Sequence, residues 1–292
     1  MTKPLIWTTD WHVSHAAADG PYTSTANAVA LAAHLTGLEA GLILATGDNG
    51  YGGTDWGNPL DYAAFKANAY DLLTPTPHVL PGNHDEDEDI GDGTSTSWVN
   101  WLSVFPSLPA HFAVDWPGTN VRVIGLYAYI IHTTNYEGFF QVDLSEVAWV
   151  ADQLAAADAA RKKCILCSHA PVHPLYGGIH DSKGGAELLA AMVAAGNVLA
   201  HLGGHRHPTE TYAMTLDGVV HILGQAVAAN AAGCSYYQLD YDHGVVTVRQ
   251  FSSYTPYAEK AAGLYTPSTF GEVVTSRPID PGSPSRLRRS AG

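Results

Sequence analysis

Five short apolar segments of this chain each end in a group of aspartate, asparagine or histidine residues, and this arrangement constrains the fold most strongly. The segments span residues 5–7, 42–45, 78–80, 165–167 and 198–202, and stretches of helical periodicity separate them. This alternation predicts an α/β fold. In open α/β sheets ligands bind beyond the carboxyl ends of the strands. If the five strands are neighbours, their polar ends are expected to converge.

The residue types in these groups point to a metal centre. They read D-W-H at 10–12, G-D-N at 47–49, G-N-H-D at 82–85, S-H at 168–169 and G-H-R-H at 204–207. Imidazoles and carboxylates suit manganese, iron, zinc or cobalt, and a set without thiolates disfavours a structural zinc cage. Two divalent ions about 3.5–4 Å apart that share a carboxylate would use such a set. The seven candidate ligands are Asp10, His12, Asp48, Asn83, His169, His205 and His207.

The ordered set D-x-H, G-D, G-N-H-D, H and G-H-x-H resembles the signature of calcineurin-like metallophosphoesterases over about residues 5–210. Its spacing resembles the class III cyclic-nucleotide phosphodiesterase branch. The resemblance implies an α/β fold of four αββα layers, with two mixed β-sheets and a dinuclear site at the carboxyl ends of the strands. It also implies one ion held by Asp10, His12, Asp48 and His207. The second would be held by Asp48, Asn83, His169 and His205, so that Asp48 bridges.

The resemblance also implies the reaction. A metal-bridging hydroxide would attack the phosphorus of a phosphate ester. His84 matches the family histidine that lies near the scissile phosphate without binding metal, so it is the candidate catalytic acid. Asp85 begins an acidic run to residue 89, which we interpret as a solvated loop, with the alternative that Asp85 helps to place His84.

Tyr51 occupies a position at which branches of the family that the chain resembles carry different residues. It stands three residues after Asp48, as in the G-D-x-x-Y block of purple acid phosphatases, but those enzymes lack the histidine of D-x-H. Ser/Thr phosphatases of the wider family carry an acid at this position. We therefore predict His12 as the metal ligand and Tyr51 as a contact to another site residue or to substrate. The other candidate substrate contacts are Trp56, His173 and Tyr176.

The charge balance bears on the substrate. Lys and Arg total 14 against 28 Asp and Glu, a formal net charge of −14. Such a surface repels nucleic acid polymers and anionic membranes, so a small molecule is expected. No arginine follows G-N-H-D, where a clamp for a dianionic monoester would lie. This favours a small phosphodiester of the cyclic-nucleotide or glycerophosphodiester type. A phosphomonoesterase is the alternative, and a non-catalytic scaffold is a remote one.

Further expectations concern organisation and location. The early sequence has no signal peptide, and no apolar run approaches the ~20 residues that span a bilayer. Three cysteines favour a reducing, cytoplasmic setting. We predict Cys164 and Cys167, three apart on a strand, to be buried structural residues on opposite faces. The oligomeric state, including a homo-oligomer, stays open.

The domain organisation is predicted as follows. Residues 1–251 form the metallophosphoesterase domain, and 252–292 form a C-terminal extension whose Pro-, Ser- and Arg-rich end is disordered. Residues 111–142 and 209–251 are read as successive strands, which a second, largely antiparallel sheet would absorb.

Overall fold

The structure is a computed structural model. It describes residues 2–15, 23–51, 58–85, 96–106, 111–132, 138–172, 184–208, 211–228, 234–242, 245–253 and 270–279.

The first of two six-stranded sheets carries three of the five polar strand ends. Its order is β16-β15-β14-β1-β4-β5, in which β1, β4 and β5 run parallel and the other three pair antiparallel. The strands are β1 (Leu5–Thr8), β4 (Leu42–Thr46), β5 (His78–Leu80), β14 (Cys234–Asp242), β15 (Val245–Ser253) and β16 (Phe270–Ile279).

The second sheet carries the other two polar strand ends. Its order is β12-β13-β11-β10-β7-β6, with β13, β11, β10 and β7 parallel and antiparallel strands at both edges. The strands are β6 (Phe112–Asp115), β7 (Val121–Gly125), β10 (Lys163–Cys167), β11 (Val198–Gly203), β12 (Tyr212–Leu216) and β13 (Val219–Leu223). Two short pairs lie outside both sheets: β2 (Val13–Ser14) with β3 (Thr23–Ser24), and β8 (Tyr129–His132) with β9 (Gly138–Gln141).

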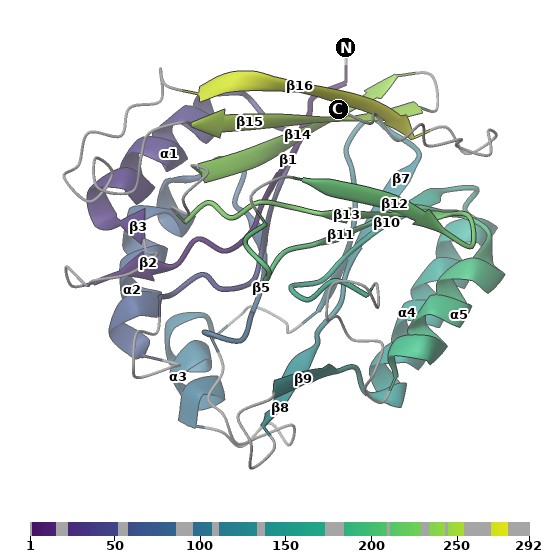
Figure 1. The fold of residues 1–292 in the computed structure, drawn as a ribbon, viewed down its shortest axis with the longest axis horizontal. Coiled ribbons are helices and arrows are strands. Elements are labelled where there is room, and N and C mark those ends of the chain that lie inside the picture. Colours follow the sequence, from purple (N-terminus) through teal and green to yellow (C-terminus); the bar gives the residue numbers. More distant parts are fainter. Residues whose placement is uncertain are drawn as a thin grey trace.

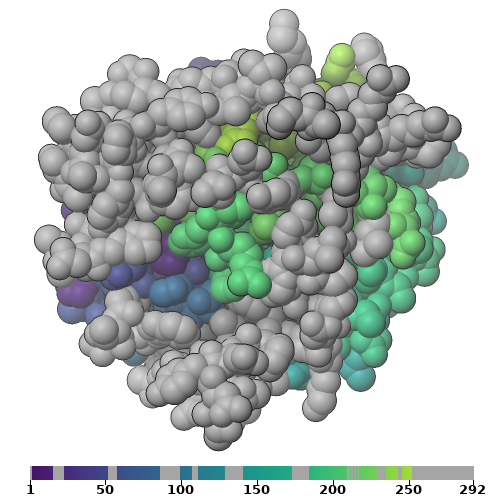
Figure 2. Space-filling view, viewed as in Figure 1, coloured from purple at the N-terminus to yellow at the C-terminus, as the bar shows by residue number. Residues whose placement is uncertain are grey.

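Helices cover the outer face of each sheet and complete four layers (Figure 1). The first sheet packs against α1 (Thr25–Gly37), α2 (Pro59–Asn68) and α3 (Thr96–Val104), with a 3₁₀ turn at Tyr70–Leu72. The second packs against α4 (Leu144–Ala159) and α5 (Gly185–Ala195). In the space-filling view, the purple and blue N-terminal part lies at the left and the teal and green part at the right (Figure 2). The predicted αββα sandwich is confirmed.

Alternating side chains on the central strands hold the layers together. On β1, Ile6 packs toward the helices of the first layer, whereas Leu5 and Trp7 pack between the two sheets. There they meet Ile165 and Leu202 from the second sheet. Strands buried on both faces are continuous apolar runs, which is why the sequence shows them so clearly. The shared core brings the carboxyl ends of both sheets to one edge.

One detail of the predicted topology is wrong. Apart from the short pair β8–β9, the described strands of 111–142 and 209–251 do not form a separate, largely antiparallel sheet. β6, β7, β12 and β13 extend the sheet of β10 and β11, while β14 and β15 extend that of β1. The free edges of each parallel core are where these antiparallel strands pair. The polar strand ends converge across two sheets because the sheets stack on the shared core.

Within the predicted C-terminal extension, β16 pairs with β15 and forms the edge of the first sheet. Residues 254–269 and 280–292 lie outside the described part, and the domain boundary stays a prediction.

None of the helices in the described ranges has the length and apolar character needed to cross a bilayer.

The two described cysteines lie in different cores, as predicted. Cys164 packs with α4 and α5, whereas Cys167 faces the other sheet, and neither is in a disulfide. Burial raises the pKa of the Cys164 thiol to about 12 and that of Cys167 further still. Both thiols are therefore protonated at neutral pH.

These thiols should resist alkylating and disulfide reagents in the native protein, since the thiolate is the nucleophile. In a Cys234→Ser variant, a thiol-reactive dye should label no cysteine at neutral pH and two in denaturant. Labelling of either one in the folded state at the rate of a small free thiol would contradict this placement.

Candidate metal centre

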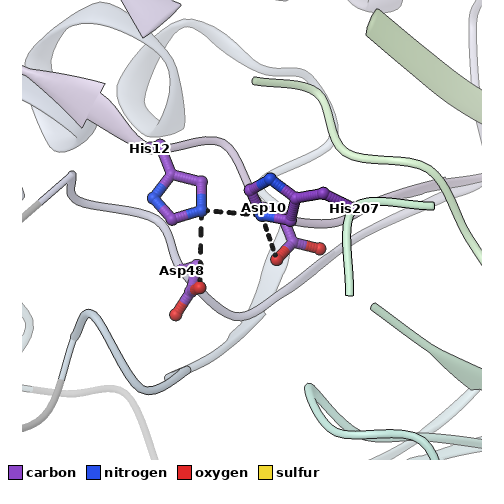
Figure 3. Close-up of side chains that lie close together, drawn as sticks. All are labelled: Asp10, His12, Asp48 and His207. Carbon is purple, nitrogen blue, oxygen red and sulfur yellow. Dashed lines mark hydrogen bonds and ion pairs between the residues drawn. The ribbon is translucent and has the colours of Figure 1, made fainter. Parts of the chain in front are cut away.

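The turns after β1, β4 and β11 bring together a first group of possible ligands: Asp10, His12, Asp48 and His207 (Figure 3). Nε2 of His207 lies 3.0 Å from Oδ1 of Asp10 and 3.0 Å from Nε2 of His12. Nε2 of His12 lies 3.4 Å from Oδ2 of Asp48. One ligand atom from each residue lies within 4.8 Å of all the others, a spacing that one ion can span.

A second group shares Asp48 with the first and adds His169 and His205. Nε2 of His169 lies 3.3 Å from the same Oδ2 of Asp48. The amide oxygen of Asn83 is 2.9 Å from Nε2 of His169 and 2.8 Å from Nδ1 of His205. A single oxygen of Asp48 thus lies between imidazoles of both groups, the arrangement that a bridging carboxylate requires.

The backbone is strained where it presents these side chains. Eight non-glycine residues in the described ranges have positive φ, and five of them belong to the two groups: Asp10, His12, Asp48, His205 and His207. Each such residue costs on the order of 1–3 kcal/mol. Strain of this kind clusters at active sites and ligand-binding sites, so its concentration here supports a functional role for these side chains.

The glycines of the motifs make room for the polar groups. A β-carbon at Gly47 would lie 2.3 Å from Nδ1 of His169, and one at Gly82 would lie 2.3 Å from Oδ1 of Asp48. At Gly204 it would lie 1.9 Å from the hydroxyl oxygen of Thr9. Each glycine therefore permits a close approach that any side chain would prevent.

The buried carboxylates and imidazoles of the site shift one another's pKa values. Burial alone would raise the pKa of Asp10 and Asp48, but neighbouring histidines, His207 and His169 foremost, hold both pKa values below the ordinary range. Burial opposes protonation of His169 as well, yet Asp48 and Asp10 raise its pKa to about 9. The same balance with Asp10 raises the pKa of His207.

The other two imidazoles remain neutral. Burial lowers the pKa of His12 and of His205 to about 3 in each case, despite the attraction of the carboxylates. Two carboxylates, an amide oxygen and neutral imidazoles in a dry cluster are donors that suit divalent transition-metal ions. The raised pKa values of His169 and His207 reflect the negative charge of Asp48 and Asp10, which bound divalent ions would offset. The residues therefore fit the implied dinuclear group.

His84 lies at the rim of the two groups, half buried, with its ring centroid 4.6 Å from that of His12. Its Nδ1 is 2.8 Å from the backbone carbonyl of Tyr51. A carbonyl only accepts, so Nδ1 carries a proton and Nε2 is the ring nitrogen left to contact a ligand. The Tyr51 ring lies nearly parallel to that of His84, 6.4 Å away between centroids. Tyr51 thus orients the histidine through its backbone, a role that its side-chain type does not reveal.

Asp85 is fully buried, so its interpretation as the start of a solvated run is wrong. Its carboxylate accepts the backbone N–H groups of Asn49, Gly50 and Gly82 and the side-chain amide of Asn49, at 2.9–3.1 Å. Its carbonyl accepts the Tyr62 hydroxyl. Burial and the nearby Asp48 raise the pKa of Asp85 to about 7, and these donors offset the rise in part. Asp85 joins the G-D-N and G-N-H-D turns.

Three predicted substrate contacts, Trp56, His173 and Tyr176, lie outside the described residues. Thr9 is a site residue that sequence reasoning misses. Its hydroxyl lies 2.7 Å from Oδ2 of Asp10, but a threonine before an aspartate has no pattern that marks such a role.

The comparisons agree with this geometry. The family model for calcineurin-like phosphoesterases matches residues 3–209, and the chain belongs to that family. Its fold is similar to a dimetal phosphatase from Danio rerio, with a TM-score of 0.65 and 14% identity over 85% of this chain and 96% of that one. It is also similar to purple acid phosphatase PPD1 from yellow lupin seeds, with a TM-score of 0.58 and 13% identity over 87% of this chain and 52% of that one.

A comparison with curated proteins gives no significant match. At 13–14% identity, the likeness to solved structures shows the fold alone. The resemblance to the class III phosphodiesterase branch stays a prediction.

Replacing Asp85 by alanine should destabilise the fold strongly, because three buried backbone N–H groups lose their acceptor. We expect a loss of about 3 kcal/mol or more in the free energy of unfolding, measured by urea titration. Asp71→Ala, which removes an exposed carboxylate paired with Lys66, is the matched control and should change it by under about 1 kcal/mol. Equal effects of the two substitutions would contradict the role of Asp85.

Proposed function

We propose that the chain is a metal-dependent phosphoesterase that hydrolyses small phosphodiesters of the cyclic-nucleotide or glycerophosphodiester type. The observation that carries the proposal is the sharing of one buried Asp48 oxygen between two groups of ligand atoms. Two divalent ions bound there would activate water as a nucleophile and offset the charge that develops on the phosphoryl oxygens. In this proposal all seven candidate residues are ligands.

His84 is proposed as the catalytic acid. Its Nδ1–H is committed to the Tyr51 carbonyl, so the proton that it exchanges is on Nε2. A histidine oriented in this way at the rim of the site can protonate the leaving alkoxide. The Tyr51 ring, beside those of His84 and His12, is proposed as a substrate contact.

Charge supports a diester over a monoester. The turns at residues 9–15, 47–51, 82–85, 168–172 and 204–208 contain a single Lys or Arg, Arg206. Within the described ranges, Lys66, Arg122, Lys162 and Arg249 are paired with carboxylates of Asp71, Asp115 or Asp240. A dianionic monoester brings one more negative charge than a diester, and these turns offer little beyond the metal ions to hold it.

A phosphomonoesterase of the same family is the second candidate. Arg206 is exposed and stands between two candidate ligands, His205 and His207, where it could meet an additional phosphate charge. Its charge acts on the site, since it contributes to the lowered pKa of His205. A comparison of substrates separates the two candidates.

Protein loaded with manganese should show a higher kcat/KM on bis(p-nitrophenyl) phosphate than on p-nitrophenyl phosphate. Asp48→Ala should lower both values roughly a hundredfold or more, because the loss of the shared carboxylate weakens both ion positions. Asp71→Ala should leave both unchanged.

A preference for the monoester would favour the second candidate and leave the metal chemistry intact. Activity that survives both thorough chelation and Asp48→Ala would contradict the metal-dependent mechanism as a whole.

A further inference from the structure

Each buried carboxylate of the site has one oxygen held by the protein and another oxygen that faces imidazole nitrogens. For Asp48, the backbone N–H of His84 donates to Oδ1 at 2.8 Å, while Oδ2 lies between His12 and His169. For Asp10, Oδ1 faces Nε2 of His207 at 3.0 Å. This division fixes which oxygen of each carboxylate can meet a metal ion.

The oxygen of Asp10 on the protein side, Oδ2, receives two donors. The hydroxyl of Thr9 lies 2.7 Å from it, and the backbone N–H of His205 lies 3.0 Å from Oδ2 and 3.1 Å from Oδ1. Thr9 thus supplies a side-chain donor to Oδ2, and His205 supplies a backbone donor. Without the Thr9 hydroxyl, Oδ2 would keep only the backbone N–H of His205, which is shared with Oδ1, so the orientation of the carboxylate would be less restricted.

The position of the Thr9 hydroxyl is itself tightly determined. Thr9 is fully buried, and its Oγ1 is also 3.0 Å from the backbone carbonyl of Thr46. Both neighbours are acceptors and the hydroxyl has one proton, so it donates to the nearer and charged oxygen of Asp10, with the Thr46 carbonyl as the second, longer contact. The close approach of Gly204, at which a β-carbon would lie 1.9 Å from Oγ1, encloses it from the other side.

We propose that Thr9 is a positioning residue for the ion held by Asp10, His12, Asp48 and His207. By holding Oδ2, its hydroxyl keeps Asp10 as a ligand through Oδ1 alone, in the orientation that faces His207. The inference rests on the proposed function, since it assumes that the two groups bind metal ions. Hydrogen bonds that orient a ligand commonly change metal affinity by about 10- to 100-fold when they are lost.

The effect should be confined to one of the two ion positions. His169, a candidate ligand of the other ion, donates its Nδ1–H to the Thr46 carbonyl at 3.0 Å. The Thr9 hydroxyl contacts the same carbonyl, but its removal leaves both the His169 donor and the acceptor in place. Asn83 and His205 contact each other independently of the hydroxyl. A general loosening of the fold would instead weaken both positions together, so selectivity distinguishes positioning from a structural role.

Thr8 provides a matched control one residue away. It is equally buried, donates to the carbonyl of Leu44 at 2.7 Å and accepts the indole N–H of Trp11 at 2.9 Å. Thr8→Val therefore removes a buried hydroxyl of the same strand end, and both of its bonds go to residues that are not candidate ligands. It should cost stability without changing metal affinity.

The test measures both manganese dissociation constants by chelator competition in wild type, Thr9→Val, Thr9→Ser and Thr8→Val. His207→Ala and Asn83→Ala, which each remove a ligand of one position, assign the constants. Thr9→Val should weaken manganese binding by roughly 10- to 100-fold at the position that His207→Ala affects. Binding at the other position should be unchanged. Thr9→Ser, which keeps the hydroxyl, should restore it. If Thr9→Val does not fold, Thr9→Ala replaces it.

Unchanged constants in Thr9→Val, equal weakening of both, or the same weakening in Thr8→Val would overturn the proposal for Thr9. Failure of the wild-type protein to bind manganese at all would instead overturn the proposed metal centre. The two failures are thus distinguishable.

Discussion

The position of one carboxylate oxygen, Oδ2 of Asp48, between the imidazoles of His12 and His169 is the constraint on which the rest of the structure depends. The two imidazole nitrogens lie 3.4 and 3.3 Å from it. Asp48 and His12 follow strands of the first sheet, and His169 follows a strand of the second. The contact therefore exists only if the two sheets stack with their carboxyl ends level. The core of Trp7, Leu44, Ile165 and Leu202 between the sheets sets that alignment.

This arrangement costs folding free energy, and the surrounding fold offsets that loss. Two carboxylates are buried, five of the residues that present the site have positive φ, and glycines at 47, 82 and 204 leave room for neighbouring polar groups. Rigid buried strands on both sides restrict how far the turns can relax. Strain of this kind persists where the surrounding structure over-determines it and is concentrated at functional sites. The hydrogen bonds of Asp85 also restrict the turns, because they join two of the turns that carry candidate ligands.

The sequence predicted the fold class and the grouping of the seven polar residues because both depend on short-range signals. Apolar runs that end in Asp or His mark strand ends, and the order of the motifs carries the family resemblance. Strand pairing was harder, because tertiary packing, and not the local sequence, decides that β6 extends the second sheet and β14 the first. Asp85 looked solvated because its acidic neighbours did, whereas its donors from Asn49 and Gly50 lie more than thirty positions away in the sequence. The carbonyl of Tyr51 and the hydroxyl of Thr9 act through geometry that residue type does not encode.

The most direct test of the dinuclear centre is anomalous X-ray diffraction from crystals of the manganese-loaded protein, with data collected at the manganese absorption edge. The account predicts two anomalous peaks per chain, about 3.5–4 Å apart, on either side of the Asp48 carboxylate. One peak should lie beside Asp10, His12 and His207, and the other beside Asn83, His169 and His205. A single peak, or peaks away from Asp48, would contradict the central claim.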